Sequence, residues 1–234
     1  MEFREGAGRL SLDFIRTLRR RGLAGEVEEL PDVRALAAWT HQFSPGPLTP
    51  TADASGEGRP AVRDVSGGEP VVRDGGGGEP VVRGNAAGRS VVRGGAGAAG
   101  WSSGVRVEEA WELREAVNAL VRAARDGRAA GQGERDVVNR AAARPAPAPW
   151  LGGDGRLRWA AEDPVAAMLA LVARDALELV TSPAIERVRA CAGEGCAALF
   201  LDGSRPGTRR WCSMDTCGNR AKKQTLRSKA TGAS

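Results

Sequence analysis

Apolar residues recur at helical spacing in several stretches of this chain, and short strand-like runs lie between them. Intervals of three and four residues predict amphipathic helices over residues 9–20, 31–43, 105–125 and 163–180, and a shorter helix over 134–143. Pro31-Asp32 and Asp163-Pro164 are typical of helix starts. Arg114 and Arg122 are expected mostly outside the apolar face of the third helix. The chain outside residues 44–100 is therefore expected to be mainly helical.

Three shorter stretches predict strands. Trp150-Leu151 and residues 156–159 flank a Gly-Gly-Asp-Gly turn, which predicts a β-hairpin. Residues 198–201 and 208–211 flank a segment dense in turn-forming residues and predict a second hairpin, and residues 187–189 predict a strand before it. Residues 219–229 contain no proline or glycine and predict a final helix, capped by Asp215 or Thr216.

Residues 44–100 contain a ten-residue repeat with units at 59–64, 69–74, 79–84 and 89–94. Each unit contributes only a Val-Val or Ala-Val pair, which is too little apolar surface for a stacked solenoid. The repeats therefore indicate a low-complexity, largely disordered insertion. The expected organisation is an N-terminal domain in two parts, 1–48 and 101–184, interrupted by an insertion at 49–100 and followed by a C-terminal module at 185–234. The expected fold class is α+β, with a mostly helical N-terminal domain that carries a short β-hairpin.

Residues 49–100 are expected to be dispensable for folding, so replacing their repeats by a short Gly-Ser linker should leave the melting temperature nearly unchanged. One apolar pair in ten residues cannot offset the ~1–2 kcal/mol of backbone entropy that each ordered residue costs. Calorimetric melting of the two chains checks this prediction, and a large decrease would show that the repeats pack on the core.

The chain has four cysteines, Cys191, Cys196, Cys212 and Cys217, arranged as C-x4-C, fifteen residues and C-x4-C. Each short pair can supply two corners of a tetrahedron, and the loop brings the pairs together, which predicts one zinc ion. No histidine or carboxylate is placed to leave an open position, so the zinc is expected to be structural. Two disulfides or buried free thiols are the alternatives. Nothing at the N-terminus supports export, and disulfides rarely persist in the reducing cytosol, where we expect this protein.

The formal net charge of +5 is concentrated in the C-terminal module. Residues 191–234 carry eight Lys or Arg against three acidic residues, whereas the other 190 residues carry 26 of each. Localised positive charge is typical of proteins that bind polyanions. Six basic residues are the candidate nucleic-acid contacts: Arg209 and Arg210 on the predicted hairpin, and Arg220, Lys222, Lys223 and Arg227 on the final helix.

The C-terminal module resembles the CGNR zinc finger, through Cys217-Gly218-Asn219-Arg220 and through Phe200, Asp202, Ser204 and residues 209–213. Residues 10–15, Leu-Ser-Leu-Asp-Phe-Ile, resemble the opening motif of the ABATE domain, although that family commonly has asparagine where this chain has Arg16. The resemblance implies a treble-clef-like finger whose four cysteines bind zinc, joined to an ABATE domain in a stress-induced transcriptional regulator. We expect Asp13 of this motif to be a cap or a buried partner of a nearby arginine, not a catalytic residue.

These features favour a DNA-binding transcriptional regulator whose N-terminal domain senses a signal or mediates assembly. The alternative is a zinc module that binds RNA or protein, since compact four-cysteine folds serve all three partners. An enzyme is disfavoured because the sequence shows no nucleophile elbow, phosphate loop, paired carboxylates or histidine constellation. The longest apolar run, residues 165–173, is too short to span a membrane, so no membrane partner is expected.

Overall fold

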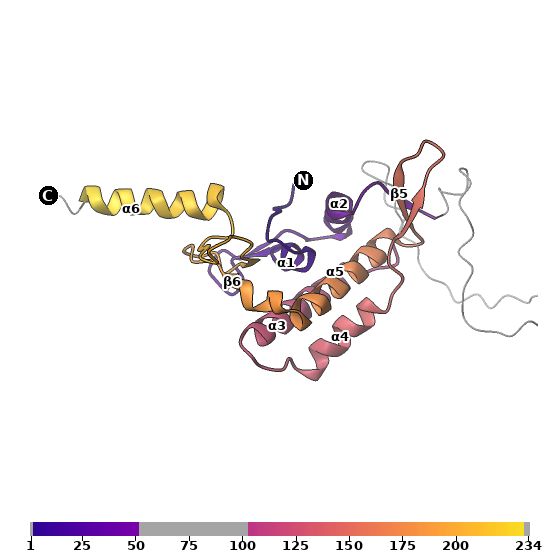
Figure 1. Ribbon diagram of the computed structural model, residues 1–234, viewed down its shortest axis with the longest axis horizontal. Coiled ribbons are helices and arrows are strands. Elements are labelled where there is room, and N and C mark those ends of the chain that lie inside the picture. Colours follow the sequence, from indigo (N-terminus) through magenta and orange to yellow (C-terminus); the bar gives the residue numbers. More distant parts are fainter. Residues whose placement is uncertain (1, 52–102, 232–234) are drawn as a thin grey trace, which may run out of the picture.

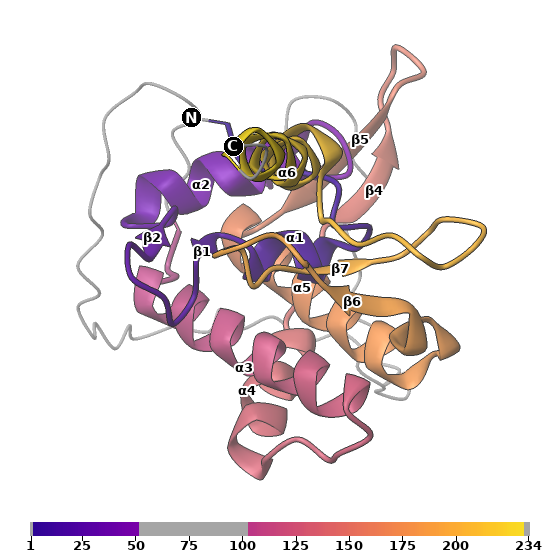
Figure 2. The same ribbon diagram turned by 90° about the vertical axis from the view of Figure 1, so that its left-hand side faces the viewer.

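Helix α5 (Pro164–Thr181) lies at the centre of the larger part of the protein, and helices α1 to α4 all contact it (Figures 1 and 2). The computed structural model describes residues 2–51 and 103–231, which form an α+β structure. Asp163 caps α5 by accepting a hydrogen bond from the backbone N–H of Ala166, and Pro164 stands in its first turn. Ten residues of α5 are buried, so this helix supplies much of the core.

The remaining elements follow the chain order shown in Figure 1. Before the insertion they are α1 (Leu10–Ile15), β1 (Leu18–Arg19), β2 (Val27–Glu28), α2 (Val33–Phe43) and β3 (Leu48–Pro50). After it come α3 (Val107–Arg125), α4 (Gln132–Ala142), β4 (Ala148–Leu151) and β5 (Leu157–Ala161). Beyond α5 lie the 3-10 helix η2 (Pro183–Arg187), β6 (Val188–Ala190), β7 (Leu199–Leu201), the π-helical turn η3 (Met214–Gly218) and α6 (Asn219–Thr231). The α+β fold class is confirmed, and so are the helices predicted from apolar periodicity after residue 30.

The first predicted helix is shorter than its apolar spacing indicated. α1 ends at Ile15, and the Thr17 hydroxyl donates a hydrogen bond to the carbonyl of Phe14 just beyond that end. The chain then forms the antiparallel pair β1–β2. Arg20 takes a left-handed conformation, φ 55°, in the connection between these strands, which a helix through residue 20 would not allow.

A three-stranded sheet packs beside the N-terminal end of α5. β4 and β5 form the predicted hairpin, with Trp150 opposite Arg158. β3, which the sequence pattern did not predict, adds to β5 in parallel, with Leu48 opposite Trp159. Residues 49 and 50, which we had assigned to the insertion, therefore belong to this sheet.

The described residues on either side of the insertion both form hydrogen bonds close to Asp163. Thr51 donates its backbone N–H to the carbonyl of Ala161 at 2.9 Å. The Ser103 hydroxyl and the Gly104 backbone N–H both donate to the carboxylate of Asp163 at 2.9 Å. The decapeptide repeats lie outside the described residues, and replacing residues 59–94 leaves both attachments in the chain.

Arg114 of α3 is buried, contrary to the expectation that it would lie outside the apolar face. Its side chain is 3% exposed and forms a two-point ion pair with Glu28 of β2, at 2.7 and 2.5 Å. It also donates to the hydroxyl of Thr17 at 3.1 Å. A buried guanidinium needs such partners, so this residue joins the β1–β2 hairpin to α3.

Asp13 is a buried structural carboxylate, as expected from the sequence. It accepts hydrogen bonds from the backbone N–H of Ala7 at 2.9 Å and from the Arg16 guanidinium at 3.1 Å. Burial raises its pKa, although the Ala7 N–H and the charge of Arg16 act in the opposite direction. Arg16, which stands where the resembled family commonly has asparagine, is thus the partner of this carboxylate.

The C-terminal module shares its core with the helices of the N-terminal part. Leu199 and Phe200 of β7 are buried in the same apolar cluster as α1 and α5. The backbone N–H of Leu201 also donates to the carbonyl of Ala7 at 2.7 Å. The module is therefore packed against the N-terminal part rather than tethered to it. None of the helices in the described ranges is both long and apolar enough to cross a membrane.

Candidate metal centre and basic helix

The first part of the C-terminal module is a two-stranded sheet that leads into the first cysteine. β6 pairs with β7 in antiparallel fashion, with Val188 opposite Leu201, and Cys191 follows β6 directly. The predicted pairing of residues 198–201 with 208–211 is wrong, because residues 208–211 form no strand. The backbone hydrogen bond from Ala192 N–H to the carbonyl of Arg210, 2.8 Å, joins that segment to the module's first loop.

The side chain of Asp202 explains why residues 202–209 form a closed loop instead of a hairpin. Its Oδ1 accepts from the backbone N–H and the hydroxyl of Ser204, and its Oδ2 accepts from the backbone N–H of Arg209 at 2.9 Å. These hydrogen bonds, the one to the Ser204 hydroxyl foremost, lower the pKa of Asp202. The loop therefore returns the chain to the cysteines through a side chain instead of a strand ladder.

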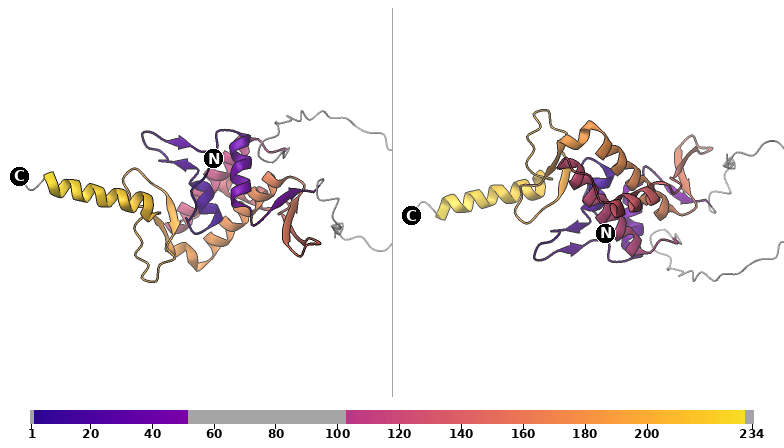
Figure 3. Two further views of the ribbon diagram at one scale, coloured as in Figure 1. Left: turned by 90° about the horizontal axis from the view of Figure 1, so that it is seen from above. Right: turned by 90° about the horizontal axis from the view of Figure 1, so that it is seen from below.

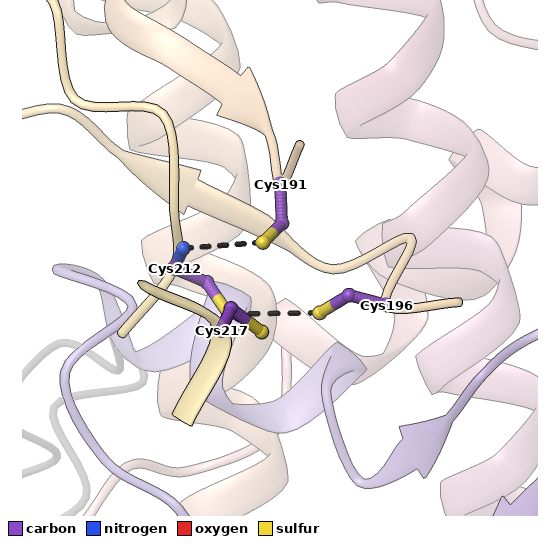
Figure 4. Close-up of side chains that lie close together, drawn as sticks. All are labelled: Cys191, Cys196, Cys212 and Cys217. Carbon is purple, nitrogen blue, oxygen red and sulfur yellow. Dashed lines mark hydrogen bonds between the residues drawn. The ribbon is translucent and has the colours of Figure 1, made fainter. Parts of the chain in front are cut away.

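The four cysteine sulfur atoms converge on one point (Figure 4). All four Sγ atoms lie within 4.8 Å of one another, with Cys196 and Cys212 at 3.6 Å and Cys212 and Cys217 at 3.7 Å. A tetrahedral zinc ion with Zn–S bonds of about 2.3 Å separates its sulfur ligands by about 3.8 Å. The four cysteines are free of disulfides, and three of them are buried. The cluster therefore fits one structural zinc ion and no disulfide pair.

The protonation chemistry of the cluster also favours a metal ion. The hydrogen bond with the Cys212 thiol lowers the pKa of Cys196 to about 4, and the same bond together with burial raises the pKa of Cys212. Burial, followed by the hydrogen bond with Cys196, raises the pKa of Cys217 to about 11. Without a cation, one thiolate forms at the expense of the others, because like charges at this distance repel. A divalent cation allows all four to ionise together.

Backbone groups around the cluster hold the sulfur atoms in place. The N–H groups of Gly193 and Cys212 donate to the Sγ of Cys191 at 3.4 and 3.3 Å. A Cβ atom at Gly193 would lie 3.1 Å from the Sγ of Cys217, so the loop between the first two ligands needs glycine there. Gly193 was not among the predicted site residues. A glycine between two paired cysteine ligands is a sequence signal that could have identified it.

The final helix begins directly at the last ligand. Ser213, not Asp215 or Thr216 as predicted, caps the π-helical turn η3 by accepting from the backbone N–H of Thr216 at 3.4 Å. Cys217 lies in this turn, and α6 continues from it. Figures 1 and 3 show α6 extending away from the rest of the protein. The metal centre therefore fixes the direction in which this helix leaves the body.

Four of the six candidate basic residues lie on the exposed surface of α6: Arg220, Lys222, Lys223 and Arg227. Three of them, Arg220, Lys223 and Arg227, border one open groove of about 540 Å³. Glu194 borders the same groove and accepts a hydrogen bond from Gln224 at 2.8 Å. The structure thus brings these three of the six candidate residues together.

The other two candidates, Arg209 and Arg210, differ in their contacts and exposure. The Arg209 guanidinium lies 4.7 Å from the ring centroid of Phe200 and donates to the carbonyls of Trp211 and Cys212. These contacts stabilise the loop that carries the third ligand. Arg210 is exposed, with its guanidinium 5.2 Å from the ring centroid of Trp211.

Comparison with known proteins finds two family models along the chain. Residues 187–230 match the model described as "CGNR zinc finger", and this range contains all four cysteines. Residues 8–183, well over half of the chain, match the model ABATE, described as "Putative stress-induced transcription regulator". The comparison with curated proteins gives no significant match.

Proposed function

Since the chain belongs to the ABATE family and ends in a CGNR zinc finger, we propose that it is a DNA-binding transcriptional regulator. In this proposal the zinc centre fixes α6 to the body, and α6 enters the major groove of duplex DNA, which is wide enough to admit an α-helix. The proposed role is non-catalytic. It belongs to a stress response, which the family description names.

The observation that carries this proposal is the basic helix projecting from the metal centre. Arg220, Lys222, Lys223 and Arg227 are exposed on it, and the excess positive charge of the chain lies in this module. A mostly polar helix of 13 residues has little stability of its own in water. A phosphate surface would place negative charge opposite these cations.

Replacing Arg220, Lys223 and Arg227 together by glutamine should weaken binding to duplex DNA and flatten its salt dependence. Each lost phosphate contact lowers the slope of log K against log salt by roughly 0.9, so three contacts account for about 2.7. Fluorescence anisotropy of zinc-loaded protein on genomic DNA fragments, at several salt concentrations, measures both quantities. The matched control replaces Arg34, Arg140 and Arg156, three exposed arginines outside the finger, by glutamine.

The control variant should bind DNA with nearly the parental slope, and both variants should retain one zinc ion per chain. An unchanged slope in the α6 variant would remove this helix from the interface. Tighter binding to RNA than to DNA of the same sequence would replace the proposal by an RNA-binding module, because the A-form major groove is too narrow for a helix.

A further inference from the structure

A cavity of about 360 Å³ lies between the N-terminal part and the zinc finger. Its walls come from the β1–β2 hairpin, from α3 and from the first loop of the finger, and Figure 3 shows this hairpin extending toward the finger. Arg20 of the hairpin comes close to the finger: a Cβ atom at Gly195 would lie 3.8 Å from its Nε. Arg122 of α3 donates to the carbonyl of Ala197, also in the finger, at 3.3 Å. Both parts of the chain thus form this site.

The cavity is bordered by seven arginines, and only some of them are neutralised. Arg16, Arg19 and Arg21 form ion pairs with Asp13, Glu29 and Glu115. The other four, Arg4, Arg20, Arg122 and Arg220, have no carboxylate within ion-pair distance among residues 2–51 and 103–231. In that same part of the chain, Glu194 is the one carboxylate that borders the cavity, and it already accepts a hydrogen bond from Gln224.

This excess of cations is unfavourable without a partner. Burial, followed by the charges of Arg125 and Arg21, lowers the pKa of Arg122. The polar contacts that the structure gives Arg122 are neutral, to the Asn118 side chain at 3.1 Å and to the carbonyl of Ala197. An anion in the cavity would offset this repulsion.

Hydrogen bonds to the metal centre do not account for these arginines. A zinc ion with four thiolates carries two negative charges, and Cys196, Cys212 and Cys217 border the cavity. In the described ranges, however, no arginine donates to a cysteine sulfur, and the Sγ of Cys191 accepts from backbone N–H groups instead. The thiolates therefore take no hydrogen bond from these arginines, whose guanidinium groups border the cavity.

The walls also include apolar side chains, from Ile15, Leu18, Val27 and Leu199. A site that combines several guanidinium groups with such walls suits an anion that has an organic part. A phosphate monoester fits best, because its two charges and several oxygens match the fork geometry of guanidinium groups.

We propose that this cavity binds a small organic phosphate, held by Arg4, Arg20 and Arg122 of the N-terminal part and by Arg220 of the finger. The ligand would contact both parts of the chain. A change in its concentration would therefore change the orientation of the finger. The proposal goes beyond DNA binding and does not depend on it, since binding of the phosphate is measured without DNA.

The test is isothermal titration calorimetry of zinc-loaded protein with adenosine monophosphate and, separately, with inorganic phosphate. We expect one site per chain, with tighter binding of adenosine monophosphate than of inorganic phosphate. The variant Arg4→Gln/Arg20→Gln should weaken this binding about tenfold or more, as expected when hydrogen bonds between charged groups are lost. The control Arg34→Gln/Arg156→Gln makes the same change in net charge away from the cavity and should bind as the parental chain does.

Among residues 2–51 and 103–231, the side chains of Arg4 and Arg20 have no hydrogen bond or ion pair, so their replacement should leave the melting temperature and zinc content unchanged. Absence of binding for both probes would overturn the proposal, as would equal weakening by the cavity variant and the control. Loss of zinc from the cavity variant would show that the arginines serve the metal centre. Weakened DNA binding with unchanged binding of adenosine monophosphate would assign the arginines to the DNA surface and would also overturn the proposal.

Discussion

Replacing Cys212 by serine should release the zinc ion and unfold the finger from β6 onward. A structural zinc site contributes about 10–16 kcal/mol of binding free energy, which is folding free energy for a module this small. Cys212 is buried and lies 3.6 and 3.7 Å from the sulfur atoms of Cys196 and Cys217, so its loss leaves three thiolates with no fourth corner. Metal analysis and amide hydrogen exchange across residues 188–231 measure the two effects.

The control for this prediction is Ser213→Ala, which removes the cap of η3 next to the ligand without removing a sulfur atom. It should retain one zinc ion per chain and lose only about 1 kcal/mol, the typical cost of a lost helix cap. Because β7 shares the core of the N-terminal part, Cys212→Ser should also lower the melting temperature of the whole chain. A parental zinc content in Cys212→Ser would refute the four-cysteine site.

Replacing Arg114 by methionine should lower the free energy of unfolding by about 3 kcal/mol. Removing one partner of a buried ion pair typically costs 3–5 kcal/mol, because the remaining charge is left without compensation. We expect the lower end of this range, since the side chain of Glu28 is 28% exposed and water can reach it. Urea denaturation followed by circular dichroism measures the loss.

Two further variants separate the ion pair from a loss of packing. Arg114→Met/Glu28→Met removes both charges and should be clearly more stable than Arg114→Met alone. Arg140→Met, on the exposed surface of α4, should change stability by less than about 0.5 kcal/mol. A loss below about 1 kcal/mol in Arg114→Met would show that the pair is not a support of the fold.

The features that were predictable from sequence depend on residues near one another in the chain. The helices α2, α3 and α5 follow from local apolar spacing and from caps such as Asp32 and Asp163. The zinc site follows from two short cysteine pairs, because each pair already defines two corners of a tetrahedron.

The features that were missed depend on partners far apart in sequence. Arg114 is buried because Glu28, 86 residues earlier, lies beside it. β7 pairs with β6 rather than with residues 208–211 because Asp202 closes the intervening loop through its side chain. The arginine-lined cavity draws on the N-terminal segment, α3 and the finger, and no local pattern brings these together.

Both ends of the insertion are attached beside Asp163, and this has a consequence for how the number of repeats can change during evolution. Because Thr51 and Ser103 are bonded to Ala161 and Asp163, the fold fixes the span that the insertion must close, whatever its length. The sequence predicts a flexible insertion, and closing such a loop costs only about 0.6 kcal/mol more for each doubling of its length. Gain or loss of whole decapeptide units, which tandem repeats in DNA readily undergo, is thus nearly neutral for stability. We therefore expect repeat number to differ between close relatives while Thr51, Ser103 and Asp163 keep their partners.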